Sequence, residues 1–111
     1  DAIIISTPEY NKGLSGVLKN ALDWVSRIKP NPWAAKPVAV MSAAGGRAGG
    51  EVAQFTLRHC LTPFAPHLVL GPSVMLADAR KQFDENGNLT NEITVKGLSA
   101  LMEALRKAAT S

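Results

Sequence analysis

The sequence predicts an α/β fold, a doubly wound parallel sheet with helices on both faces, and three observations support this. Residues 1–7 and 36–42 are apolar runs without polar alternation, which is typical of parallel strands buried between layers. Each run leads into a loop rich in small residues, and then into a segment with apolar residues at helical spacing. The resulting β-α-β-α-β-α order favours right-handed crossovers in a single parallel sheet.

Each element follows from a local pattern. The first strand should be buried on both faces, and Pro30 and Pro32 should end the helix that follows it. Thr90 or Asn91 is a suitable N-cap for the last helix. The expected elements are a strand at 1–7, a helix at 14–28, a strand at 36–42, a helix from about 51 to Pro63, short strands at 67–70 and 73–77, and a helix at 91–109.

The first strand is as apolar as a central strand, which needs a neighbour on each edge and cover on each face. Three main strands and three helices make too thin a sheet to supply both. We therefore expect residues 1–111 to be the C-terminal part of a single domain, with earlier βα units preceding Asp1.

Composition argues against several classes of partner. The 12 Lys and Arg residues are scattered and give a net charge of +3, without the dense basic stripe expected of a nucleic-acid-binding protein. No apolar run approaches the roughly 20 residues of a membrane span. We expect neither a nucleic-acid nor a membrane partner.

Cysteine and histidine content argue against an internal disulfide and against a metal site. Cys60 is the single cysteine, which excludes an internal disulfide and fits a reducing, cytoplasmic compartment. His59 and His67 have no Cys, Asp or Glu partner at metal-ligand spacing, so no metal site is expected.

The residues that could bind a ligand follow the two main strands. In an open parallel sheet, ligands lie outside the C-terminal ends of the strands, where loops 6–13 and 42–50 are expected. Glycine in such loops lets backbone N–H groups approach a flat ring or an anion closely, and the next helix directs its N-terminus at the same place.

The stretch STPEYNKGLSGVLKNALDW, residues 6–24, closely resembles the signature of the NAD(P)H-dependent FMN reductases, flavoproteins of flavodoxin-like fold that reduce quinones, chromate and azo compounds. The loop SAAGGRAGG, residues 42–50, and the tail from Phe83 onward resemble the family's second flavin loop and closing helix. The positions that match the first signature are Thr7, Pro8, Glu9, Tyr10, Asn11, Gly16, Leu18, Lys19, Asn20, Ala21, Leu22, Asp23 and Trp24.

The resemblance implies a cofactor site and a reaction. Nicotinamide from NADPH or NADH would stack on the exposed flavin face and pass a hydride to it, so no side chain need be catalytic. The resemblance also implies pairing into a homodimer or homotetramer. The residues that it assigns to FMN are Pro8, Glu9, Tyr10 and Asn11 in the first loop and Ser42, Ala43 and Gly46 in the second. Arg47, in the second loop but outside any strict motif, is a further candidate as a contact to a phosphate of the cofactor or the dinucleotide.

We therefore expect an FMN oxidoreductase that reduces a small-molecule acceptor such as a quinone, chromate, an azo compound or free flavin. Two alternatives stay open. One is a flavodoxin-type electron carrier that does not oxidise NAD(P)H, although such carriers are usually acidic. The other is an inactive fragment, because the family's phosphate-binding loop would precede Asp1.

Overall fold

The computed structural model describes all of residues 1–111. It contains α-helices α1 (Gly16–Val25), α2 (Glu51–Leu61) and α3 (Glu92–Thr110), with 3₁₀ turns η1 (Thr62–Phe64) and η2 (Ala79–Lys81). The strands are β1 (Ile3–Thr7), β2 (Pro37–Ala43), β3 (His67–Leu68) and β4 (Met75–Leu76). All strand pairs are parallel, so the predicted α/β class and its order of elements are confirmed.

Strand β2 is the centre of the sheet. It pairs with β1 along one edge, from Ile3↔Val38 to Thr7↔Ser42. On the other edge β3 pairs with the start of β2 and β4 with its end. The strands predicted at 67–70 and 73–77 are shorter than expected. Residues 70–73, which include Gly71 and Pro72, make no backbone hydrogen bond to β2, whereas Val69 and Val74 still do. Proline has no N–H to donate to the ladder, which explains the interruption.

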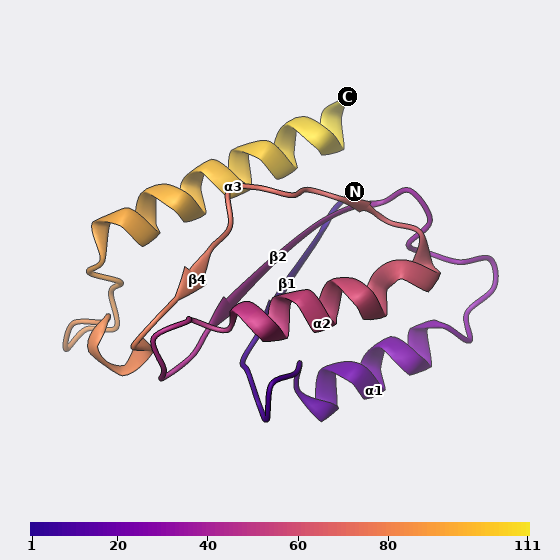
Figure 1. Cartoon of the computed structure of the whole chain (residues 1–111). Helices are drawn as coiled ribbons and strands as arrows, with labels where there is room; N and C mark the ends of the chain where they lie inside the picture. The colour runs from indigo at the N-terminus through magenta and orange to yellow at the C-terminus, as the bar shows by residue number, and fades with distance from the viewer.

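The helices form two layers, one on each face of the sheet (Figure 1). Helices α1 and α2 lie together over one face, and α3 crosses the other. Ser15 caps α1, since its Oγ accepts from the N–H of Leu18 at 3.2 Å, and α1 therefore begins two residues later than predicted. Asn91 caps α3 in the same way, which confirms the predicted N-cap. None of the helices combines the length and hydropathy that a membrane span requires.

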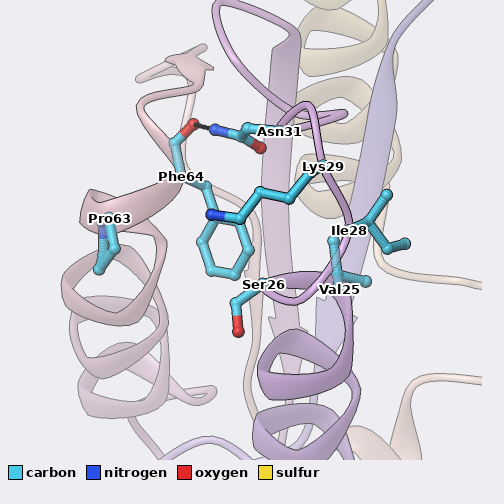
Figure 2. Close-up of a pocket in the computed structure, with 7 residues that line it drawn as sticks. All are labelled: Val25, Ser26, Ile28, Lys29, Asn31, Pro63 and Phe64. Carbon is cyan, nitrogen blue, oxygen red and sulfur yellow. Dashed lines mark hydrogen bonds between the residues drawn. The ribbon is translucent and has the colours of Figure 1, made fainter.

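The connection from α1 to β2 folds back onto η1 at the N-terminal ends of the strands. Figure 2 shows Asn31 lying over this turn, with its Nδ2 donating to the carbonyl of Phe64 at 2.8 Å. Trp33 packs against the Phe64 ring at a centroid distance of 5.3 Å. The hollow bounded by Asn31, Phe64 and the end of α1 measures about 120 Å³. This volume is below the usual range for a ligand site, about 300–1,000 Å³. These contacts close the end of the sheet opposite the two ligand loops.

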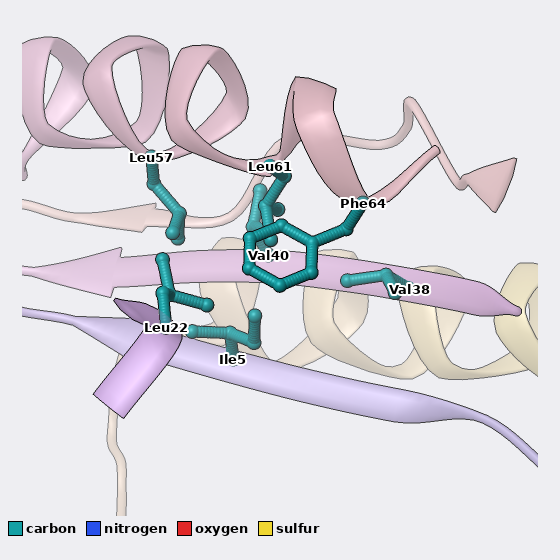
Figure 3. Packing of buried hydrophobic residues seen from close by; sticks show 7 residues of the cluster. All are labelled: Ile5, Leu22, Val38, Val40, Leu57, Leu61 and Phe64. Atoms are coloured by element: carbon teal, nitrogen blue, oxygen red, sulfur yellow. The ribbon is translucent and has the colours of Figure 1, made fainter. Parts of the chain in front are cut away.

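The main core lies between the sheet and the α1–α2 layer. Figure 3 shows Leu22 of α1 and Leu57 and Leu61 of α2 packing onto Ile5, Val38 and Val40, with Phe64 closing one end. A second cluster on the opposite face joins Ala39 and Val74 to Leu101 and Leu105 of α3. Each helix layer buries part of the apolar stripe that the sequence predicts, whereas Val17, Ile28 and Phe55 of those stripes stay exposed.

Strand β1 departs from the prediction. Its side chains alternate, with Ile5 and Thr7 buried, while Ile4 is 50% exposed and Ser6 is also exposed. The reason is that β1 pairs with β2 alone, and α3 packs over β2 rather than over β1. The expectation that β1 is buried on both faces is therefore wrong for residues 1–111.

Candidate functional site

The two loops expected to bind a ligand leave the same edge of the sheet. Because Thr7 and Ser42 are paired in register, the segments that follow them start side by side at the C-terminal ends of β1 and β2. Figure 1 shows both loops, and the chain after β4, at this one end of the molecule. The topology thus brings the predicted site residues of two sequence regions to one place.

The first loop ends in a tight turn. Tyr10 and Gly13 exchange two backbone hydrogen bonds of 3.0 and 3.1 Å, and Asn11 and Lys12 between them have φ of 54° and 68°. Two positive φ values in succession are the mark of a type I′ turn, a conformation that lysine adopts only at a cost. The turn exposes Tyr10, Asn11 and Lys12 to solvent, and the Tyr10 side chain is 60% accessible.

Glu9 and Thr56 tie this loop to α2. The Oε1 of Glu9 accepts the N–H of Ala53 at 2.9 Å, in the first turn of the helix. The N-cap of α2 is Gly50, which has no side chain to cap it, so the distant carboxylate supplies that acceptor. Thr56 Oγ1 in turn accepts the N–H of Leu14 at 3.1 Å. The carboxylate of Glu9 is thus directed at α2, while its predicted role at the cofactor edge stays a prediction.

The second loop is closed by two glycines at which a side chain would be strained and would clash with its neighbours. Gly49 has φ +64°, and a Cβ there would lie 2.6 Å from the carbonyl oxygen of Met75. Gly50 has φ +90°, and its Cβ would lie 2.7 Å from the side chain of Ser42. The Ser42 hydroxyl donates to the Gly49 carbonyl at 2.6 Å and is buried. This end of the loop is therefore packed against the ends of β2 and β4.

The middle of the second loop faces solvent. Gly46 and Arg47 are exposed, Ala43 is half-buried, and Arg47 forms no ion pair within the chain. The loop is anchored to the segment that follows β4, since the carbonyls of Ala44 and Gly46 accept the N–H groups of Ala79 and Asp78, respectively. A Cβ on Gly45 or Gly46 would meet no atom within 4 Å, so the loop leaves open space above these two glycines.

The residues at this edge suit the polar rim of a flavin. A flat heteroaromatic ring with carbonyl and ring-nitrogen acceptors needs backbone donors on a surface it can approach closely. Exposed N–H groups here that donate to no carbonyl of the chain include those of Asn11, Lys12, Gly45 and Gly46. The predicted FMN site therefore fits the group expected there, although the binding roles of the individual residues stay predictions.

Sequence reasoning missed Gln54, which belongs to the same region. It is fully buried, and its Nε2 donates to Ser42 Oγ and to the carbonyl of Val74, both at 2.8 Å. The signal in the sequence was a polar residue at helical spacing from Leu57 and Leu61, on the face of α2 that packs against the sheet.

One further hollow lies beside the site, and a second lies between α1 and α2 toward η1, at the other end of the sheet. The first, of about 310 Å³, opens on the α3 face beside the strand ends, between Ser6 and Met41 of the sheet and Phe83 and Leu98 beyond it. The second, of about 450 Å³, contains Lys19, His59 and Cys60. No group of three or more His, Cys, Asp or Glu residues is arranged to hold a metal ion.

Comparisons with known proteins agree with this geometry. Residues 1–81 match the family model of the NADPH-dependent FMN reductases. An NAD(P)H-dependent FMN reductase of Pseudomonas aeruginosa is 39% identical over 106 residues, covering 96% of this chain and 57% of that protein. An NADPH:quinone oxidoreductase of Arabidopsis thaliana is 40% identical over 108 residues, covering 96% of this chain and 54% of that protein.

A solved structure shows the same fold. The flavoenzyme NAD(P)H:(acceptor) oxidoreductase FerB of Paracoccus denitrificans superposes with a TM-score of 0.82 at 30% identity, covering 96% of this chain and 62% of that one. The chain spans about half the length of the curated relatives it matches. Its parallel sheet, its two strand-end loops and these similarities together show that the chain belongs to the NADPH-dependent FMN reductase family.

Proposed function

We propose that the protein containing this chain binds FMN and oxidises NADPH or NADH to reduce a small-molecule acceptor. One observation carries the proposal: two glycine-containing loops with unpaired backbone N–H groups lie at the C-terminal ends of paired strands. Relatives named as quinone oxidoreductases favour quinones among the acceptors. Chromate, azo compounds and free flavin are further acceptors suggested by the resemblance to the family.

The chemistry that FMN supplies when bound is the transfer of a hydride's two electrons from NAD(P)H to the acceptor. The protein's part is placement. Backbone N–H groups of Asn11 and Gly46 would face the polar rim of the flavin ring. Tyr10 would lie at the edge of the flavin, where the tyrosine side chain would exclude water. Arg47 is exposed and unpaired, so its guanidinium can meet a phosphate of the dinucleotide or the cofactor.

We also propose that residues 1–111 form the C-terminal part of one flavodoxin-like domain. The support is the open edge of β1, the half-exposed Ile4, and the adjacent pocket of about 310 Å³. A strand beside β1, followed by a helix on the α3 face of the sheet, would cover the open edge, Ile4 and the pocket. The connection from that helix to β1 would be the usual right-handed crossover. Such a unit would also bring its own helix N-terminus to the strand ends, where the FMN phosphate needs an anchor. By itself this chain is expected to retain FMN weakly.

A homodimer or homotetramer is the proposed assembly, with the outer face of α1 as a contact surface between two copies. Val17 and Trp24 are 83% and 72% exposed and lie seven residues apart on one side of the helix, and Ile28 just beyond it is 53% exposed. Trp24 is bordered by Asp23 and by Arg27, which makes no ion pair in the chain. An antiparallel two-fold pairing of α1 would bury the apolar stripe and place each Arg27 near the partner's Asp23.

The proposed compartment is the cytoplasm. The support is the free thiol of Cys60, which is half-buried between α1 and α2, together with a reaction that uses reduced nicotinamide cofactor.

The test uses the protein expressed from its complete gene and, beside it, residues 1–111 alone. After incubation with FMN and removal of free cofactor, the flavin absorbance near 450 nm is recorded, and NADPH is then added without oxygen. We expect a yellow complete protein that bleaches within seconds and recovers on addition of a quinone. A yellow protein that never bleaches would instead indicate an electron carrier, and a colourless complete protein would contradict the proposal.

A further inference from the structure

Gln54 joins three separate segments through a single side-chain amide. Its Nε2 donates to Ser42 Oγ at the end of β2 and to the carbonyl of Val74 ahead of β4, each at 2.8 Å. The hydroxyl of Ser42 in turn donates to the carbonyl of Gly49 at 2.6 Å, so Gln54 is linked to Gly49 through Ser42. The closing end of the second loop is therefore held to the sheet by a chain of side-chain hydrogen bonds that starts at Gln54.

Stability alone does not account for this glutamine. Its Oε1 is buried and has no hydrogen-bond partner, a defect that costs about 1–3 kcal/mol. The amide cannot be reversed to relieve the defect, because Oε1 would then face the carbonyl of Val74. An apolar residue of the same size would leave no new defect, since the carbonyl of Val74 also accepts the N–H of Ser42, and Ser42 keeps its bond to Gly49.

The first loop is attached to the same turn of α2. Ala53, the residue before Gln54, donates its N–H to Glu9, and Thr56, two residues after Gln54, accepts the N–H of Leu14. The supports of both loops thus meet within four successive residues of a single helix. Because both loops are anchored to one rigid helix turn, the position of one loop is fixed relative to the other.

We propose that Gln54 is a positioning residue for the flavin, which fixes the loop at 43–50 relative to the loop at 8–13. The proposal rests on the proposed FMN chemistry and deepens it by assigning a residue that acts through Ser42 and Gly49. Loops held at a fixed separation bind a rigid ring without first losing conformational freedom, so FMN affinity depends on the amide of Gln54.

The test compares Gln54→Met, which keeps the volume but removes the donor, with Leu101→Met in the core on the opposite face. Leu101 is equally buried and contacts neither loop, which makes it a matched control. In the complete protein, FMN affinity is measured by quenching of flavin fluorescence and ring placement by visible circular dichroism. Urea unfolding and amide hydrogen exchange of the cofactor-free forms are measured in parallel.

We expect Gln54→Met to unfold at the same or a higher urea concentration than the wild type, yet to bind FMN at least tenfold more weakly with an altered dichroism spectrum. Exchange should accelerate in residues 43–50, and Leu101→Met should change neither exchange nor affinity. Gln54→Glu should recover part of the affinity at pH 5, relative to wild type at the same pH, because only the protonated carboxyl can donate to Ser42.

Three results would overturn the inference: an unchanged FMN affinity in Gln54→Met, an equal loss in Leu101→Met, or unchanged exchange of the 43–50 loop. Failure of the proposed function looks different, because in that case the wild-type protein itself would not bind FMN. The exchange measurement needs no cofactor, so it tests the positioning of the loop under either outcome.

Discussion

The carboxylate of Glu9 accepts a hydrogen bond from the backbone N–H of Ala53, 44 residues further along the chain, at 2.9 Å. Glu9 thereby caps a helix whose own N-cap is a glycine. The same contact fixes the path of the first loop, so the stability of α2 and the shape of the proposed site depend on one side chain.

Replacing Glu9 should therefore destabilise the fold. We expect Glu9→Ala to lower the free energy of unfolding by about 0.5–2 kcal/mol, and Glu9→Gln, which keeps an acceptor, by less. Glu51→Gln is the control, since Glu51 carries a charge in the same helix turn without bonding to Ala53. Urea unfolding measures all three, and equal losses in Glu51→Gln and Glu9→Ala would contradict a capping role.

The glycines of the second loop should differ sharply in their tolerance of a side chain. Gly49→Ala forces a Cβ to within 2.6 Å of the Met75 carbonyl oxygen at a positive φ, so we expect a loss of roughly 2 kcal/mol or more in unfolding free energy. Gly46→Ala has open space and should leave stability nearly unchanged while weakening FMN binding, because the ring must approach its backbone. Unfolding and FMN titration distinguish the two effects, and unaltered binding in Gly46→Ala would remove Gly46 from the site.

The turn before α3 should respond to acid. Hydrogen bonds from the backbone N–H of Asn88, its side chain and the N–H of Asn86 lower the pKa of Asp84 below its ordinary value. A carboxyl whose pKa is lowered by folding stabilises the fold fully above its unfolded pKa of about 3.9 and loses that contribution as the pH falls through the folded value. The difference in unfolding midpoint between wild type and Asp84→Ala should therefore be largest above about pH 5 and shrink below pH 4. Glu85→Ala, which removes an exposed neighbouring carboxylate without such bonds, should show a smaller and flatter difference.

The exposed face of α1 should control assembly. We expect Trp24→Glu to weaken association of two copies by more than about tenfold, because it places a carboxylate in the centre of the proposed contact. Ile93→Glu on α3, where Ile93 is 84% exposed, is the control and should not change the mass. Sedimentation equilibrium measures both, and a Trp24→Glu protein of wild-type mass would exclude this surface as the contact.

The open edge of β1 provides a test of the domain proposal. In the complete protein, Ile4→Lys should lower the unfolding free energy by about 3 kcal/mol, because covering units would bury the charge. In residues 1–111 alone, where Ile4 is half exposed, the loss should be much smaller. Ile93→Lys should be mild in both proteins, and a mild Ile4→Lys in the complete protein would indicate that nothing covers β1.

Much of the fold was predictable because it depends on local patterns. The apolar runs at 1–7 and 36–42, the helical spacing after each loop, and Asn91 as an N-cap all act within a few residues of chain. The short strands β3 and β4 were overestimated because strand length depends on pairing with β2, and a sequence pattern does not state where pairing stops.

The sequence by itself determined the fold class, the family and the location of the two loops, because strand and helix periodicity and a long motif are written in neighbouring residues. Only the tertiary structure decided that Glu9 turns toward α2, that Gln54 holds the end of the second loop, and that Ile4 lies open to solvent. The physical reason is that these three facts depend on which distant backbone groups and helices come within contact distance. That proximity is created by the packing of α2 and α3 on the sheet, and no local pattern contains it.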